Sequence, residues 1–235
     1  MSGFTAPAPF CKNLHPSQSK RNLAVPRTSL GENNRMSITE TPMAPTMAHE
    51  ASASPNAPQD SAAVVAAELE EYRSMVTAVA QSADGRVIVN RSEAHAAVVI
   101  EYVIRSAVTE LSILTGNLHR PVYANPGVVD SLRTFFEKNA AANIRLLSEA
   151  PIDADHPLLA VLSQHASRVD MRVIQPDTAR KILFHFIVAD GRSFRFEADK
   201  TKFEALAQFG EPQIGSELKA VFDKLFARVS VKVQA

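Results

Sequence analysis

Apolar and polar positions follow helical spacing in the first well-patterned part of the chain. In residues 61–80 the apolar side chains recur three or four positions apart, at Val65, Leu69, Tyr72, Val76 and Val79. This period predicts a helix. The Asp84-Gly85 pair that follows is typical of a turn, and residues 86–89 have a short strand-like pattern. A second helix with a broad apolar face is predicted over residues 92–107, with Ser92 as its N-cap.

From residue 110 onward, short apolar runs alternate with amphipathic segments. The apolar runs 110–116, 143–149 and 169–175 are predicted strands, and the segments 125–141 and 156–166 between them are predicted helices. Strands joined through helices are crossover-connected, which gives a parallel sheet covered by helices. This part of the sequence therefore predicts an α/β layer architecture.

The last part of the chain has a different pattern. Residues 182–190 form a longer apolar run, Gly191-Arg192 indicates a tight turn, and residues 193–199 alternate apolar and polar side chains. The two segments predict an antiparallel hairpin. Residues 214–229 show helical spacing again. The predicted fold class is thus α/β, a mixed and mostly parallel sheet flanked by helices.

Residues 1–60 show neither the apolar spacing of a helix nor the alternation of a strand. They hold eight of the fourteen prolines among Ser, Thr, Ala and Asn. A segment of this kind buries too little apolar surface to offset the entropy of ordering it. The expected organisation is a disordered tail over 1–60, a helix for interaction or linkage over 61–85, and one α/β domain over 86–235.

Composition and charge narrow the classes of function. The chain has 235 residues with 25 basic and 25 acidic side chains, so no overall field attracts nucleic acid or a membrane surface, and nucleic-acid binding would need a local patch. The one cysteine, Cys11, lies in the predicted tail, which excludes a disulfide framework and a cysteine metal cluster. Without a long apolar run or a secretory leader, a cytoplasmic protein with no membrane span is expected.

The order of the predicted elements over roughly residues 90–230 resembles a single repeat of the phospholipase D-like superfamily. In active members of that superfamily, the strand corresponding to residues 183–190 carries His-x-Lys, four more residues and Asp; the histidine attacks phosphorus and the lysine neutralises phosphate charge. Counting back from Asp190, the histidine position holds Leu183 and the lysine position holds His185. Leucine has no lone pair to donate, so the motif is degenerate.

A shifted alignment restores one group and loses another. It places His185 at the nucleophile position but leaves Ile187 where the lysine belongs. Active members combine two such motifs, so the resemblance implies a homodimer that pairs through this face. The alternative function is a phosphodiesterase or nuclease that uses His185 from two subunits, with Asp190 orienting it.

Two interpretations of the candidate site residues stay open. His185, between two phenylalanines, is either a hydrogen-bonded core histidine or a pocket histidine facing an anion. Asp190 is either a catalytic partner or a cap of the hairpin turn. Open α/β sheets bind ligands at the loops that follow the carboxyl ends of their strands. The candidate ligand-binding residues at the end of the first parallel strand are Thr115, Asn117, His119 and Arg120, and Arg195 on the hairpin is a fifth.

These candidate side chains suit an anionic or sugar-like ligand, although a solvated loop explains those of residues 115–120 equally well. The side chains of Ser148, Glu149, Asp153, Asp155 and His156 are a second possible site, for a metal ion. Their spacing matches no metal motif, and capping of the following helix by Asp155 is the preferred interpretation. No metal or cofactor is predicted, because no phosphate loop or other cofactor signature is present.

The function predicted from the sequence is a non-catalytic phospholipase D-like module, homodimeric, that binds a macromolecular partner or a small anionic ligand. A further hypothesis is that the tail and the helix over residues 61–80 bind a protein partner and tether the domain to a larger assembly. The helix and the domain thus receive separate predicted roles.

Overall fold

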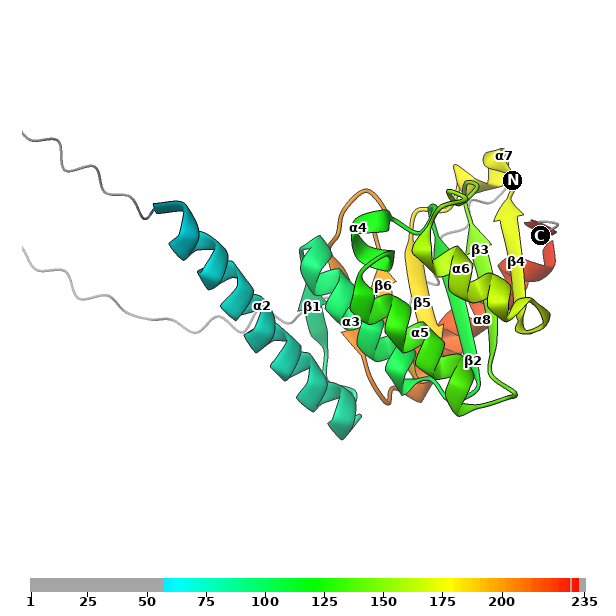
Figure 1. Ribbon diagram of the computed structural model, residues 1–235. Coiled ribbons are helices and arrows are strands. Elements are labelled where there is room, and N and C mark those ends of the chain that lie inside the picture. Colours follow the sequence, from blue (N-terminus) through cyan, green and yellow to red (C-terminus); the bar gives the residue numbers. More distant parts are fainter. Residues whose placement is uncertain (1–56, 229, 233–235) are drawn as a thin grey trace, which may run out of the picture.

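A computed structural model describes residues 57–228 and 230–232 of the chain, with side chains from residue 62 to residue 228. Most of the predicted tail lies outside this range. Within it, eight strands form one sheet, in the order β1-β7-β6-β5-β2-β3-β4-β8 (Figure 1). The strands are β1 (Ile88–Asn90), β2 (Glu110–Thr115), β3 (Asn143–Ser148), β4 (Val169–Ile174), β5 (His185–Ala189), β6 (Ser193–Glu197), β7 (Ala205–Gln208) and β8 (Ser230–Lys232).

The sheet is mixed, as predicted, but its parallel part is small. Strands β2, β3 and β4 are parallel neighbours, which confirms the interpretation of the three apolar runs. The other five pairings are antiparallel, so the expectation of a mostly parallel sheet is wrong. The difference comes largely from β1, β7 and β8. Strands β7 and β8 have four and three residues, too short for an alternating pattern to be recognised, and the strand-like pattern of residues 86–89 did not indicate which strand β1 would pair with.

Helices cover both faces of the sheet (Figure 1). One apolar cluster joins the sheet to α3, α5 and α6, and a second joins it to α8. In β5 the buried side chains alternate between them, Ile187 toward the first cluster and Phe186 toward the second. The helices are α2 (Ala57–Ser82), α3 (Glu93–Ser106), α4 (Arg120–Tyr123), α5 (Pro126–Lys138), α6 (Pro157–Gln164), α7 (Pro176–Ala179) and α8 (Pro212–Arg228).

Side chains cap the starts of α3 and α6, and the cap of α6 differs from the prediction. Ser92 caps α3 as predicted, its hydroxyl accepting from the amide N–H of His95. The predicted cap of α6, Asp155, is wrong by one residue. His156 occupies the cap position, and its Nδ1 accepts from the amide N–H of Leu158 at 3.2 Å. A ring nitrogen that accepts is unprotonated, so His156 is a neutral, buried cap.

The β5–β6 hairpin turns one residue earlier than predicted. Its central residues are Asp190 and Gly191, with φ of 49° and 63°, and the amide N–H of Arg192 donates to the carbonyl of Ala189 at 2.9 Å. Positive φ at both central residues matches the right-handed twist of a hairpin, and aspartate and glycine tolerate that conformation. In the described part of the chain, no helix has the length and apolarity needed to cross a membrane.

Candidate functional site

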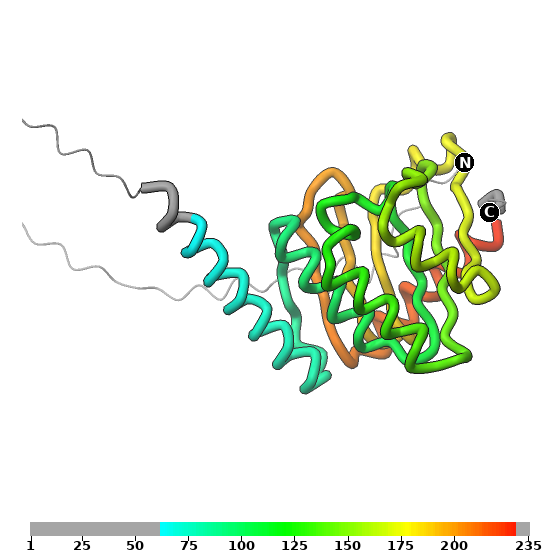
Figure 2. The backbone as a smooth tube through the Cα atoms, viewed as in Figure 1, coloured from blue at the N-terminus to red at the C-terminus, as the bar shows by residue number. Residues whose placement is uncertain are grey.

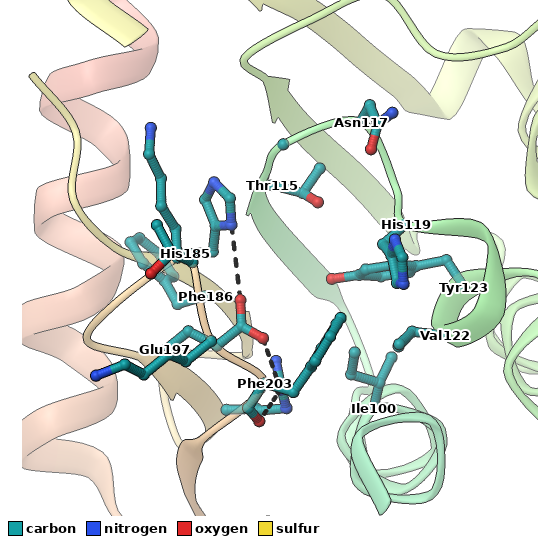
Figure 3. Close-up of a pocket in the computed structure, with 15 residues that line it drawn as sticks. Ile100, Thr115, Asn117, His119, Val122, Tyr123, His185, Phe186, Glu197 and Phe203 are labelled. Atoms are coloured by element: carbon teal, nitrogen blue, oxygen red, sulfur yellow. Dashed lines mark hydrogen bonds and ion pairs between the residues drawn. The ribbon is translucent and has the colours of Figure 1, made fainter. Parts of the chain in front are cut away.

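The carboxyl ends of β2 and β3 meet the amino end of β5, because β5 runs antiparallel to β2. Thr115 closes β2, Glu149 follows β3, and His185 opens β5. A cavity of about 220 Å³ lies beside these strand ends, between the hairpin and the loop after β2 (Figure 3). The position agrees with the general place of ligand sites in α/β sheets.

Five charged side chains form a continuous series of contacts along this region, which we call the ion-pair row: Lys200, Glu149, His185, Glu197 and Arg195. The Lys200 Nζ lies 2.7 Å from Glu149, and Glu149 Oε1 lies 3.2 Å from His185 Nε2. On the other side, His185 Nδ1 lies 3.6 Å from Glu197, whose second oxygen is 2.7 Å from Arg195. Cations and anions therefore alternate through the row.

The row sets the protonation of its members. The side chain of His185 is 15% exposed, and burial alone disfavours its charged form, yet the carboxylates of Glu149 and Glu197 outweigh burial and raise the pKa of His185. Burial opposes the charge of both glutamates too, but their cationic neighbours hold the pKa of Glu149 and of Glu197 below the ordinary value. The row thus stabilises the imidazolium form of His185 and the carboxylate forms of Glu149 and Glu197.

The far ends of the row are tied to the protein framework. The Arg195 Nε donates to Asn90 Oδ1 at 3.0 Å, and the Asn90 amide donates to the carbonyl of Phe203 at 2.7 Å. The Lys200 ammonium also donates to the carbonyl of Ala179 at 3.0 Å. Strand β1, the β6–β7 loop and α7 are thereby connected through one buried polar network, which fixes the position of His185.

The structure brings together most of the predicted ligand-binding residues. Thr115, Asn117 and His119 line the cavity together with His185 (Figure 3). Arg195 lines the same cavity. Arg120 lies outside it and forms an ion pair with Asp155 at 2.7 Å. The predicted set thus contains one surface residue and four cavity residues.

Other cavity residues escaped the sequence analysis. Glu197 and Lys200 were not singled out, and Glu149 was considered only as a metal ligand. Glu197 had a usable signal, since it lies directly opposite His185 in the hairpin register. Phe203 and Lys202 also line the cavity, from the loop between β6 and β7. A loop with no periodicity gives no comparable signal.

Asp190 lies at the opposite end of β5 from His185. Its carboxylate accepts hydrogen bonds from the amides of Val108, Thr109 and Glu110 at 2.6–2.9 Å, and from the Thr109 hydroxyl at 2.7 Å. Although burial acts the other way, these donors keep the pKa of Asp190 below its usual range. The prediction that Asp190 orients His185 is therefore wrong, because its carboxylate holds the connection between α3 and β2.

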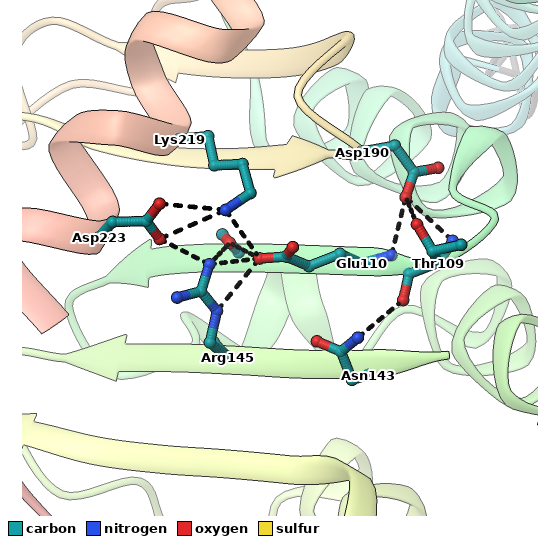
Figure 4. Close-up of polar contacts among 8 residues, drawn as sticks. Thr109, Glu110, Asn143, Arg145, Asp190, Lys219 and Asp223 are labelled. Atoms are coloured by element: carbon teal, nitrogen blue, oxygen red, sulfur yellow. Dashed lines mark hydrogen bonds and ion pairs between the residues drawn. The ribbon is translucent and has the colours of Figure 1, made fainter. Parts of the chain in front are cut away.

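A second charged cluster lies near Asp190 and joins α8 to the sheet (Figure 4). Arg145 on β3 pairs with Glu110 on β2 and, at 2.7 Å, with Asp223 on α8. Lys219 pairs with Asp223 at 3.1 Å and with Glu110 at 3.5 Å. The Arg145 guanidinium also lies 5.2 Å from the ring centre of Phe222. We call these four charged residues the Glu110 cluster.

The residues weighed for a metal site do not converge. Asp153 and Asp155 are exposed, whereas Ser148 and His156 are buried. Among residues 62–228, no group of three or more histidine, cysteine or carboxylate side chains is arranged to hold a metal ion. Glu149, the remaining member of the set, belongs to the ion-pair row.

Comparisons with solved structures give distant similarities. Nuc from Salmonella typhimurium, a phospholipase D family member, shares 13% identity at a TM-score of 0.48, over 65% of this chain and all of its own. NucT from Helicobacter pylori shares 9% identity at 0.46, over 64% and 100%. TrmBL2, an archaeal chromatin protein, shares 13% at 0.44, over 74% and 67%. At these identities and TM-scores, the similarities carry no information on activity or ligand.

Sequence comparisons place the chain more firmly. A search of curated proteins gave no match. The model of the family DUF7931, described as a domain of unknown function, matches residues 90–234. That range includes every strand of the sheet except most of β1, together with all residues of the ion-pair row. Since the match spans more than half of the chain, this protein belongs to the DUF7931 family.

Proposed function

We propose that the cavity at His185 binds a small anionic ligand and that the domain is a binding module without phosphodiesterase activity. One observation carries the proposal: both ring nitrogens of His185 face carboxylates, at 3.2 Å and 3.6 Å, in a row whose cations outnumber its anions. The geometry favours a fixed positive charge at this position. A fixed cation attracts an anion but does not attack one.

The charge of the site supports an anionic ligand. The ion-pair row has three cations and two carboxylates, so it carries a net charge of +1 when His185 is protonated. Lys202 also lines the cavity. The hydroxyl of Thr115, at the end of β2, and the amide of Asn117, in the loop that follows, lie on the opposite side (Figure 3). Charged and neutral donors around one partly enclosed space are the usual means of recognising small anions.

The same geometry argues against His185 as a nucleophile. A histidine attacks through an unprotonated ring nitrogen, and protonation of His185 is stabilised on both sides. Leu183, which occupies the other candidate nucleophile position, is 57% exposed and lies outside the cavity. Ile187 is buried in the apolar cluster on the α3 side of the sheet. Neither register of the degenerate motif therefore supplies a nucleophile and a neighbouring cation together.

Titration with inorganic phosphate, followed by calorimetry and by amide chemical shifts, tests the proposal. We expect saturable binding with shifts at Thr115, Asn117 and His185. The Lys200→Met variant should weaken binding about tenfold, since a charge-assisted contact contributes roughly 1.5 kcal/mol. The matched control is Arg133→Met, which removes an exposed cation on α5 that forms an ion pair with Asp130 of the same helix.

A hydrolysis assay with bis(p-nitrophenyl) phosphate tests the second half of the proposal. We expect no turnover by the purified wild-type protein. Turnover that the His185→Ala variant abolishes would establish the phosphodiesterase alternative instead. If phosphate, sulfate and citrate all fail to shift the cavity resonances at millimolar concentration, the anion-binding role is refuted.

A further inference from the structure

The cavity at His185 has a charged side and an uncharged side (Figure 3). The ion-pair row supplies the charged side through His185 and Glu197. The uncharged side consists of Ile100 on α3 and of Val122 and Tyr123 on α4, all of them buried. Burial raises the pKa of Tyr123, so its hydroxyl remains neutral. A ligand that fills the cavity therefore meets ions on one side and a largely apolar wall on the other.

Phe203 adds an exposed aromatic ring to the apolar wall. Among residues 62–228, eight large apolar side chains are exposed, and Phe203, at 37%, is the one that lines the cavity. Its backbone is nevertheless fixed, because its carbonyl accepts hydrogen bonds from the Asn90 amide at 2.7 Å and from Arg195 at 3.4 Å. The protein thus holds an apolar ring at the cavity without burying it, as in sites that bind organic molecules.

A second ring lies beside Phe203. The ring centres of His119 and Phe203 are 5.2 Å apart, and their planes are inclined by 40°. Glu93 of α3 holds the imidazole, since its Oε1 lies 2.8 Å from His119 Nε2. The two rings come from the β2–α4 and β6–β7 connections, which lie side by side at one end of the sheet (Figure 2). Two aromatic rings next to charged groups give a surface that suits a flat apolar group.

The cavity is larger than an inorganic anion requires. Its volume is about 220 Å³, whereas a dry apolar cavity of roughly 150 Å³ already holds benzene. A ring of that size therefore fits beside an anionic group that contacts the ion-pair row. Inorganic phosphate alone leaves the apolar wall without a partner.

We propose that the ligand of this cavity is an organic anion that carries an aromatic ring, such as an aryl phosphate. The anionic group lies at the ion-pair row, and the ring lies against Phe203 and Val122. This inference rests on the proposed function and adds the chemical class of the ligand. A purely polar organic anion would leave the same apolar surface in contact with water.

Calorimetric titration of the full chain with two phosphate monoesters tests the proposal. Phenyl phosphate carries the ring, and glycerol 3-phosphate has the same charged group on a polar chain. We expect phenyl phosphate to bind at least about tenfold more tightly, because its ring removes apolar surface from water.

Phe203→Ala should reduce this preference to about threefold or less and leave the affinity for glycerol 3-phosphate within about twofold of wild type. The matched control is Leu183→Ala. It removes another exposed apolar side chain, 57% exposed and outside the cavity, and should keep the full preference. Circular dichroism verifies that both variants remain folded.

Equal affinity of the wild-type chain for the two monoesters overturns the proposal and leaves anion binding at His185 intact. A preference that survives in a folded Phe203→Ala variant also overturns it, as does an equal loss of preference in the two variants. If neither monoester nor inorganic phosphate binds, the ligand class and the anion-binding function both fail. The wild-type comparison decides the matter even if Phe203→Ala does not fold.

Discussion

The ion-pair row and the Glu110 cluster both combine acidic and basic side chains, and they lie toward opposite ends of β3: Glu149 of the row follows the strand, and Arg145 of the cluster lies near its start. The Glu110 cluster has two carboxylates and two cations, so it is neutral, and all four groups are used to join α8 to β2 and β3 (Figure 4). The ion-pair row has an extra cation and borders a cavity (Figure 3). The comparison shows that a charged cluster becomes a candidate site through uncompensated charge beside open space.

Asp190, which belongs to neither cluster, differs from the carboxylates of the ion-pair row in how it is stabilised. Near the Glu110 cluster, Asp190 receives four hydrogen bonds, three of them from backbone amides. In the ion-pair row, the carboxylates are stabilised by charged side chains. Glu149 contacts Lys200 and His185, and Glu197 contacts His185 and Arg195. Backbone donors are fixed by the fold, whereas side-chain partners can be removed singly by mutation. The predictions below use this difference.

The largest effect is expected from Arg195→Met. Arg195 is 4% exposed and pairs with Glu197, so its removal leaves a buried carboxylate without its nearest full cation. The free energy of unfolding should fall by about 3 kcal/mol, as for other broken buried ion pairs. Urea denaturation measures it, with Arg133→Met, expected within about 0.5 kcal/mol of wild type, as the control. If Arg195→Met lowers the free energy of unfolding no more than Arg133→Met does, the ion-pair row contributes little to stability.

Asp190→Asn should have the next largest effect, and it should show that the two ends of β5 act independently. Loss of the carboxylate removes charge-assisted hydrogen bonds to the α3–β2 connection, which lowers the free energy of unfolding by about 2 kcal/mol. Amide exchange should speed up at Val108, Thr109 and Glu110. Phosphate affinity should not change, because Asp190 does not contact His185. A loss of phosphate binding in a folded variant would contradict the separation of the two ends.

Arg145→Lys tests whether the Glu110 cluster needs a guanidinium or only a positive charge. A lysine keeps the charge but cannot reach Glu110 and Asp223 together or lie flat over the rings of Phe222 and Phe226. The free energy of unfolding should fall by about 1 kcal/mol. Thermal denaturation with phosphate-binding measurements on the same sample provides the test. Unchanged stability would show that the cluster is purely coulombic.

The smallest effect expected is a difference in pH dependence between His185 and His156. Because the pKa of His185 is raised, its contribution to stability is present below the ordinary histidine pKa of about 6.5 and is lost as the pH rises through the folded-state value. Burial lowers the pKa of His156, so its contribution is present above about 6.5 and is lost as the pH falls toward the folded-state value.

Histidine ring signals followed by NMR during a pH titration measure the two directions. His185→Gln should remove the loss of stability on the alkaline side only, and His156→Gln should remove the loss on the acid side only. If His185 titrates below the unperturbed value, then the carboxylates of Glu149 and Glu197 do not control its pKa, and His185 is not a fixed cation.

The sequence predicted the parts of the fold that local patterns encode. The apolar runs located β2, β3 and β4, and helical spacing located α2, α3, α5 and α8. Strand β7 was missed because its four residues, ALAQ, include no β-branched or aromatic side chain. The amount of antiparallel pairing was underestimated, since strand order depends on which edges meet in space.

The candidate site was predicted in the same uneven way. His185 was singled out through the motif of the phospholipase D-like resemblance, Thr115 through its position at the end of a predicted strand, and Arg195 through its place on the predicted hairpin. Glu149 could not be paired with His185 from the sequence, because 36 residues separate them and the contact requires β5 to insert beside β2. Lys200 lies on a connection without periodicity. Contacts of this kind depend on tertiary arrangement alone.

The antiparallel pairing of β1 with β7 has a consequence for biosynthesis. Ile88 lies opposite Ala207, so the first strand of the sheet to be synthesised pairs with one of the last. Closing so long a loop is slow compared with forming local helices. During translation, β1 therefore spends most of the elongation time without its strand partner β7, and that interval is when a chaperone or an adjacent nascent copy has access to its edge.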